Sequence, residues 1–215
     1  MISKKELLKS WKIYPVLVDS LFRDRKELVS RFHALIDSDI DCIQLRFKSI
    51  AEREIFELAR KMTREARQRG IPVIIDDRPE TAVVLGADGV HIGKADVDPR
   101  IARKLLGKKA IIGRTTRAGI KELETFDPEY VDYLSVGPLF PTPTKPDLKA
   151  LPHSRVKRFV REVDMPVVGI GAVGSGNADR VKALGIKTVA FVRYAVTYGN
   201  TKTAIKELGR IMEDD

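Results

Sequence analysis

The feature of this chain that most constrains its fold is the regular alternation of short apolar segments with amphipathic ones. Eight apolar segments, rich in β-branched residues, are expected to be strands, and eight segments with helical periodicity follow them. Strands that are apolar on both faces are typical of a parallel sheet covered by helices. The expected strands are 13–19, 41–46, 71–76, 88–92, 109–113, 131–137, 165–171 and 188–193, and the expected helices are 25–37, 51–69, 79–85, 98–106, 117–125, 152–163, 175–184 and 200–213.

Eight strand–helix units in 215 residues, with no linker-like tract, predict an α/β protein that is a single (β/α)8 TIM barrel with one domain, 1–215. A doubly wound sheet is the alternative. It is disfavoured as a dinucleotide-binding fold because no Gly-x-Gly-x-x-Gly follows the first expected strand. Segment 137–152 contains five prolines, and we expect it to be a binding loop or a lid.

Composition narrows the classes of function. The 39 Lys and Arg residues exceed the 30 Asp and Glu residues and give a net charge of +9. The basic residues alternate with Glu in the expected helices, which argues against nucleic-acid binding and is compatible with a small anionic substrate. No apolar stretch reaches the roughly 18 residues that span a bilayer. Cys42 is the only cysteine, and the N-terminal residues lack the apolar core of a secretory signal, so a cytoplasmic location is expected.

Polar residues gather where the expected strands end, which is where barrels of this kind bind their substrates. Gln44, Arg46 and Lys48 alternate along the second strand, so they share one of its faces. Asp77 and Asp96 follow the next two strands. Two carboxylates together with phosphate oxygens commonly hold Mg²⁺. The structural alternative is that these charges form ordinary ion pairs.

The remaining strand ends extend this pattern. Lys145 joins the cations of the second strand as a complement to a polyanion. The glycines of 169–176, and a helix beginning near Ser175 or Asn177, predict a second anion site after the seventh strand. His91 lies within a strand near the same rim, and as a lone histidine it is interpreted as structural.

Five motifs occur together in a characteristic order. They are "IQLRFK", "IIDDR", "GADGVHIGKAD", "GPLFPTPTK" and "VVGIGAV" followed by an asparagine. With this set, the chain resembles the thiamine phosphate synthase family and its thiazole tautomerase-like paralogues from about residue 13 to 195. The resemblance implies a (β/α)8 barrel. It also implies the coupling of 4-amino-5-hydroxymethyl-2-methylpyrimidine diphosphate to 4-methyl-5-(2-phosphoethyl)thiazole, with release of pyrophosphate by a dissociative mechanism.

The resemblance implies roles for the diphosphate half of the site. Gln44, Arg46 and Lys48 would hold the pyrimidine diphosphate. Thr115 stands where the family usually has a serine near the leaving pyrophosphate, and Lys145 would contact that group. Of these residues, Arg46, Lys48, Thr115 and Lys145 would act in catalysis. The two aspartates named above would bind Mg²⁺.

The thiazole half departs more from the family. Thr142 and Thr144 would contact the thiazole phosphate, and Gly171 would shape its site. Ala172 replaces a second glycine, so its methyl group crowds the expected anion site. Arg193 stands near a serine that normally binds the thiazole phosphate, and it either strengthens phosphate binding or blocks the pocket.

Two further departures bear on function. Asp76 replaces the asparagine that usually precedes the metal-binding aspartate. As an ionised group it can only accept hydrogen bonds, so it contacts substrate as an acceptor, ligates the cation or repels the diphosphate. Arg117 stands where the resemblance implies a histidine that is catalytic in the tautomerase paralogues, which argues against tautomerase activity.

Synthase activity is therefore the favoured function, with two small-molecule substrates and Mg²⁺ as partners and with neither nucleic acid nor membrane. A homo-oligomer is compatible with the sequence. One alternative is a diverged paralogue that binds thiamine-related ligands without synthase turnover, in a regulatory or tautomerase-like role. A second is a barrel lyase or isomerase that acts on another phosphorylated substrate.

Overall fold

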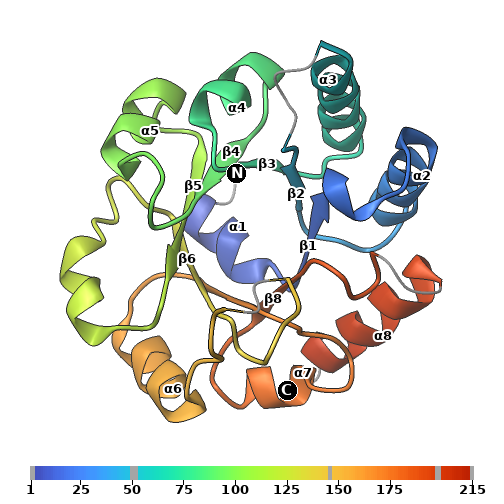
Figure 1. Ribbon diagram of the computed structural model, residues 1–215. Coiled ribbons are helices and arrows are strands. Elements are labelled where there is room, and N and C mark those ends of the chain that lie inside the picture. The colour runs from blue at the N-terminus through green and yellow to red at the C-terminus, as the bar shows by residue number, and fades with distance from the viewer. Residues whose placement is uncertain (1–2, 49–52, 145–146, 197–199, 214–215) are drawn as a thin grey trace.

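The chain folds into a closed barrel of eight parallel strands, as the sequence predicts. The computed structural model describes residues 3–48, 53–144, 147–196 and 200–213. Each strand pairs with its neighbours in chain order, and β8 closes the ring on β1 (Figure 1). The strands are β1 Ile13–Val18, β2 Ile43–Arg46, β3 Val73–Asp76, β4 Gly89–Ile92, β5 Ile111–Thr116, β6 Tyr133–Val136, β7 Val167–Ile170 and β8 Thr188–Phe191.

Apart from the N-terminal helix, the α-helices surround the barrel in the outer ring of Figure 1. Local sequence explains several of their ends. Asp24 caps α2 by accepting a hydrogen bond from the Glu27 amide at 2.8 Å, and Gly86 ends α4 in the left-handed conformation. The helices are α1 Lys4–Ser10, α2 Arg25–Ile36, α3 Arg53–Gln68, α4 Pro79–Leu85, α5 Pro99–Leu106, α6 His153–Glu162, α7 Ala178–Lys182 and α8 Thr201–Glu213, with the 3-10 helices η1 Asp19–Leu21 and η2 Ile120–Thr125.

The expected helix at 117–125 is wrong. β5 continues to Thr116, and Ala118 has a left-handed backbone with φ of 55°, so only the short η2 forms before β6. The Thr116 hydroxyl donates to Oε2 of Glu122 at 2.6 Å, which fixes this turn. Sequence analysis also missed α1, which begins with a capping box formed by Ser3 and Glu6.

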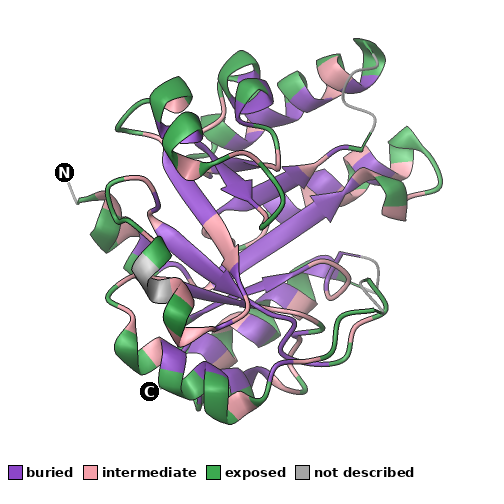
Figure 2. Ribbon diagram, turned by 60° about the vertical axis from the view of Figure 1, so that its left-hand side comes forward, coloured by how far each residue is buried: buried purple, intermediate pink, exposed green. Residues whose placement is uncertain are grey.

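Alternating residues of each strand form two separate apolar layers. One face of the strands packs against the helices, and the other fills the barrel interior. Figure 2 shows that the strands are mostly buried. Cys42 belongs to the interior, whereas Ile43 and Leu45 face the helices. A Cβ atom at position 113 would meet the Tyr133 ring, so glycine there makes room for this large interior side chain. Among the described residues, we find no helix that is long and apolar enough to span a membrane.

The N-terminal end of the barrel is closed. Leu8 of α1 and Trp11 are buried in the same cluster as Tyr14 and Tyr133, and Figure 1 shows α1 lying across the ring of strands. Trp11 packs edge-on against Tyr14, with ring centroids 5.7 Å apart. The opposite end carries the polar strand ends, and this is the end at which barrels of this kind hold their active sites.

Candidate active site

β2 presents two polar side chains to the barrel interior. Gln44 is 4% exposed, and its Nε2 atom has no hydrogen-bond partner among the residues that the structure describes. Arg46 lies two residues further along the same face, at the end of the strand. A buried amide donor without a partner costs free energy unless a ligand or water satisfies it. The inner face of β2 thus combines an unsatisfied donor with a cation.

Arg46 contacts two carboxylates that follow the neighbouring strand. Its Nη1 atom forms ion pairs with Oδ2 of Asp76 and with Oδ2 of Asp77, the latter at 2.6 Å. Asp77 has a left-handed backbone with φ of 65°, and its amide donates to the carbonyl of His91 at 2.8 Å. This turn places the two consecutive carboxylates on one guanidinium.

The other rim residues of this half are more exposed. Lys48 follows β2, and its amide donates to Oδ2 of Asp19 at 3.0 Å while its side chain is exposed. Asp96 is exposed after β4, and its Oδ2 accepts from the Gly93 amide at 2.6 Å. In the described part of the chain, no group of three or more His, Cys, Asp or Glu side chains is arranged to hold a metal ion.

His91 is the centre of a buried hydrogen-bonded chain inside the barrel. Its Nδ1 atom lies 3.0 Å from Oη of Tyr133, which lies 2.8 Å from Oη of Tyr14. Its Nε2 atom lies 2.9 Å from Oγ1 of Thr115 and 3.2 Å from Oγ of Ser135. Burial raises the pKa of both tyrosines well above the ordinary value of 10.0, so they remain protonated.

This chain connects the closed end of the barrel to the rim. Thr115 is the member that the sequence predicts as a site residue. The structural interpretation of His91 agrees with its burial, but sequence analysis missed that it holds Thr115. The alternation of residues along the strand could have indicated that His91 faces the barrel interior. It shares this inner face with Asp76, its partner in the β3–β4 register.

After β7 the backbone turns sharply against the loop that follows β6. Gly171 has φ of 111°, and a Cβ there would lie 2.5 Å from Cα of Pro138. Its carbonyl accepts from the Phe140 amide at 3.2 Å. Ala172 also has positive φ, 50°, and its carbonyl accepts from Nδ2 of Asn177 at 2.9 Å. Glycine at 171 is therefore required by close packing as well as by backbone conformation.

Arg117 ties together the two ends of the long loop after β6. Its Nη1 atom donates to the carbonyl of Gly137 at 3.2 Å, and its Nη2 atom donates to the carbonyl of Lys149 at 3.1 Å. Within the loop, the Thr144 amide donates to Oγ1 of Thr142 at 3.3 Å. In the sequence, Arg117 is only a departure from a family pattern. In the structure, it holds the two ends of this loop together.

Arg193 and Lys145 are the remaining predicted site residues. Arg193 lies just after β8 and is partly buried. Lys145 lies outside the described residues.

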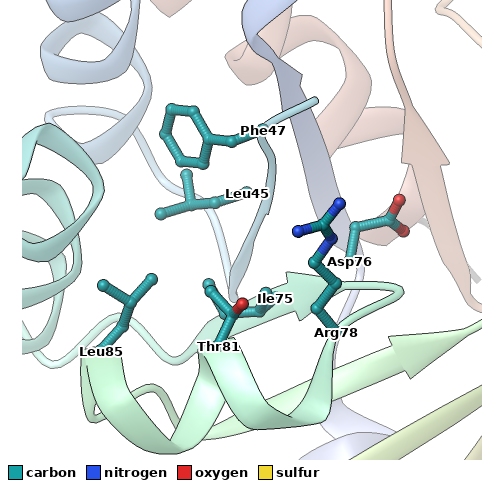
Figure 3. Close-up of a pocket in the computed structure, with 7 residues that line it drawn as sticks. All are labelled: Leu45, Phe47, Ile75, Asp76, Arg78, Thr81 and Leu85. Atoms are coloured by element: carbon teal, nitrogen blue, oxygen red, sulfur yellow. The ribbon is translucent and has the colours of Figure 1, made fainter. Parts of the chain in front are cut away.

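A small cavity lies beside the rim rather than in it. It has a volume of about 10 Å³, roughly one water molecule, and lies between β2, β3 and α4 (Figure 3). Figure 3 shows the Asp76 carboxylate pointing away from the apolar side chains of Leu45, Phe47 and Leu85. Asp76 therefore belongs to the barrel interior, and the cavity is too small for a substrate.

Comparisons with known proteins find relatives that cover most of the chain. A family model described as thiamine monophosphate synthase matches residues 13–195. The chain is 36% identical to a thiamine-phosphate synthase of Clostridioides difficile over 86% of this chain and 87% of that protein. It is 32% identical to a thiamine-phosphate synthase of Methanobrevibacter smithii over 89% of this chain and 91% of that protein.

Solved structures extend the likeness to three dimensions. A thiamine phosphate pyrophosphorylase from Pyrococcus furiosus superposes with a TM-score of 0.83 at 26% identity, over 96% of this chain and 98% of that chain. A 3-hexulose-6-phosphate synthase superposes with a TM-score of 0.66 at 13% identity, over 93% of this chain and 99% of that chain. At that identity, the second likeness concerns the fold alone.

Proposed function

The chain belongs to the thiamine monophosphate synthase family, and we propose that it is a thiamine phosphate synthase. It couples 4-amino-5-hydroxymethyl-2-methylpyrimidine diphosphate to 4-methyl-5-(2-phosphoethyl)thiazole and releases pyrophosphate. The observation that carries the proposal at the site is the inner face of β2, where the unpartnered Nε2 of buried Gln44 lies beside Arg46. A polar, anionic substrate satisfies both groups at once.

The diphosphate half of the substrate is assigned to the strand ends of β2, β3 and β5. Arg46 and Lys48 bind the diphosphate, Gln44 donates to the substrate, and Asp76 accepts from it. Thr115 donates its hydroxyl proton toward the leaving group, supported by the 2.9 Å contact with His91 that fixes the position of Oγ1. Lys145 is assigned to the same anion from its place in the sequence motif.

Magnesium fits the donors at this rim. Asp77 is 35% exposed, and Asp96 is exposed in the loop after the next strand. One or two carboxylates completed by phosphate oxygens and water are a usual set of ligands for this ion. We assign Mg²⁺ to Asp77 and Asp96, where it would stabilise the negative charge that develops on the departing pyrophosphate.

The residues of the chain have a limited chemical task in this reaction. The C–O bond between the pyrimidine methylene and the diphosphate breaks, and its electron pair leaves with pyrophosphate. The thiazole nitrogen then forms the new C–N bond to the pyrimidine cation. No protein nucleophile is needed, so Arg46, Lys48 and Thr115 act by binding and orienting the charged leaving group.

The thiazole half is assigned to the loops after β6, β7 and β8. Thr142 and Thr144 bind the thiazole phosphate, the backbone at Gly171 shapes its site, and Arg193 contributes a positive charge. The hydrogen bond between Phe140 and Gly171 supports this assignment, because it joins two of these loops. Arg117 holds the ends of the first loop in the place where the tautomerase-like paralogues need a histidine.

A two-substrate assay tests the function. The purified chain is incubated with both substrates and Mg²⁺ beside a working relative, and thiamine phosphate and pyrophosphate are measured. Turnover comparable with that of the relative is expected. Tight binding of thiamine-related ligands with no turnover would instead favour the non-catalytic paralogue.

We also propose that residues 1–215 act as one cytoplasmic domain that pairs with a second copy. Four exposed aliphatic side chains support pairing: Val83 and Val84 on α4 and Ile101 and Leu105 on α5. Exposed Glu80 and Lys104 flank them on the two helices, so a two-fold arrangement sets acidic against basic groups. Light scattering tests this pairing, and Val84→Glu should yield a monomer.

A further inference from the structure

The buried hydrogen-bonded chain that ends at Thr115 has a direction. Tyr14, Tyr133, His91 and Ser135 are each no more than 9% exposed, whereas Thr115 is partly exposed at the rim. Among the described residues, the hydrogen-bond partner of the Tyr14 hydroxyl is Oη of Tyr133, at 2.8 Å. A buried hydroxyl proton without an acceptor costs free energy, so the Tyr14 hydroxyl donates to Tyr133 rather than accepting from it.

This first donation determines the protonation of the histidine ring. The Tyr133 hydroxyl accepts from Tyr14, so its own proton goes to its second partner, Nδ1 of His91, at 3.0 Å. Nδ1 then carries no proton, and the neutral ring has its proton on Nε2. An imidazolium would present a second N–H at Nδ1. In the described part of the chain, the Tyr133 proton would then have no acceptor.

The Nε2–H group of His91 passes the same direction on to Thr115. Oγ1 of Thr115 lies 2.9 Å from Nε2, and Oγ of Ser135 lies 3.2 Å from it. The Ser135 hydroxyl also donates to Oγ1 of Thr115 over a longer distance, 3.5 Å. A hydroxyl has two acceptor lone pairs and one proton. Oγ1 of Thr115 uses its lone pairs within the chain, so its proton is left for a group outside the chain.

We propose that His91 is a positioning residue, held by Tyr133 as its neutral Nε2–H tautomer, that keeps the Thr115 hydroxyl as a hydrogen-bond donor to the departing pyrophosphate. The inference rests on the proposed function for the identity of the anion. The ionised oxygens of pyrophosphate accept hydrogen bonds, so a threonine that gave its proton to His91 would meet them with a lone pair. A donor oriented before the charge develops stabilises the leaving group without further reorganisation.

NMR of the full chain measures the tautomer directly. The chain has three histidines, so isotope-labelled histidine gives few ring-nitrogen signals. His33→Asn and His153→Asn identify two of the rings, and the third is His91. Protonated and unprotonated ring nitrogens differ widely in chemical shift. We expect Nδ1 of His91 to be unprotonated and Nε2 to be protonated at neutral pH. The opposite tautomer, or a ring protonated on both nitrogens, would overturn the inference.

Two amide substitutions separate the two contacts of the ring. The amide of glutamine reaches the place of Nε2, so His91→Gln retains a donor to Thr115. The shorter asparagine reaches only the place of Nδ1, so His91→Asn retains a partner for Tyr133 but none for Thr115. The matched control is His33→Asn, which removes a histidine that pairs with Glu65 at 2.9 Å between the outer helices α2 and α3.

Isothermal titration with inorganic pyrophosphate and Mg²⁺ measures the effect on binding without requiring turnover. Thr115→Val lacks the hydroxyl and should bind pyrophosphate at least about tenfold more weakly than wild type. His91→Asn should bind about fivefold more weakly, because the hydroxyl remains but is no longer held as a donor. His91→Gln should recover binding to within about twofold of wild type. His33→Asn should behave like wild type. In the Thr115→Val background, His91→Asn should cause no further loss.

Three binding results would overturn the inference. The first is a wild-type chain that does not bind pyrophosphate. The second is an equal loss in His91→Asn and His91→Gln, which would show a general effect of removing the ring. The third is a loss in His91→Asn that persists in the Thr115→Val background, which would mean that His91 does not act through the threonine. His91→Ala replaces His91→Asn if that variant does not fold.

The inference and the proposed function can fail separately. A chain with the expected tautomer and binding pattern that makes no thiamine phosphate would end the proposed function and leave this inference standing. A working synthase in which His91 has the opposite tautomer would do the reverse.

Discussion

Tyr133→Phe should be more damaging than Tyr14→Phe, although both substitutions remove one hydroxyl from the same buried chain. Tyr133 is 1% exposed, and its Oη atom lies 2.8 Å from Oη of Tyr14 and 3.0 Å from Nδ1 of His91. Removing the Tyr133 hydroxyl takes a hydrogen-bond partner from two buried atoms, Oη of Tyr14 and Nδ1 of His91. Removing the Tyr14 hydroxyl leaves Tyr133 still bonded to His91.

The expected magnitudes follow from that count. A buried polar group that loses a partner costs about 1–3 kcal/mol, and two groups lose one here, so Tyr133→Phe should lower the free energy of unfolding by up to about 6 kcal/mol. Tyr14→Phe loses one hydrogen bond without orphaning a group, which costs about 1 kcal/mol. In a domain of this size, 1 kcal/mol corresponds to about 2–4 °C in Tm. The double variant lacks the orphaned Tyr14 hydroxyl, so it should be no less stable than Tyr133→Phe.

Urea unfolding of wild type, both single variants and the double variant gives the four corners of a double-mutant cycle. The expected cycle is strongly non-additive, because the second substitution removes a group that the first has orphaned. Equal losses in the two single variants, with additive behaviour in the double variant, would refute the hydrogen-bonded chain as the reason for these side chains.

Three other predictions concern the proposed magnesium site, the loop after β6 and pH. Asp96→Ala should abolish Mg²⁺-dependent turnover. It should shift Tm by less than about 4 °C, because the side chain is exposed. A large loss of Tm with turnover retained would instead favour a structural role for Asp96. Arg117→Ala should free both ends of 137–152 and speed proteolysis there; unchanged cleavage would contradict the tie. Burial raises the pKa of Cys42 above 9.0 and those of Tyr14 and Tyr133 above 10.0. The unfolded chain loses these protons first, so the free energy of unfolding should fall above about pH 9 by up to about 1.4 kcal/mol per pH unit and group. If the free energy of unfolding measured in urea does not change with pH in this range, the raised pKa values of these groups would be contradicted.

Sequence alternation predicted which residues enter the barrel, because it depends only on backbone geometry. The alternate spacing of Gln44, Arg46 and Lys48 predicted one shared face. Gln44 and Arg46 lie on that face, but β2 ends at Arg46 and Lys48 is exposed beyond it. The number and order of strands were also readable, since each apolar segment is bounded by an amphipathic one. The expected helix at 117–125 failed because local features, the Thr116–Glu122 bond and the left-handed Ala118, ended it early.

Contacts between strands could not be read from the sequence, because they depend on register. The pairing of Leu45 with Ile75 brings the ends of β2 and β3 level, and only then does Arg46 meet Asp76. Similarly, His91 reaches across β5 to Ser135 of β6, a contact that no spacing along the chain indicates. The sequence named most of the rim residues, but it did not show which of them hold one another.

The departures from the family pattern acquire a different meaning once these partners are known. Asp76 is paired with Arg46, Arg117 bonds two loop carbonyls, and the carbonyl of Ala172 is held by Asn177. Each substituted residue is thus integrated into local structure, so none of the three requires an empty or collapsed site. The altered residues are better explained as changes in how the site is held and charged than as loss of the site. Asp76 is the sharpest case, because its carboxylate pairs with Arg46, the residue that we propose binds the diphosphate.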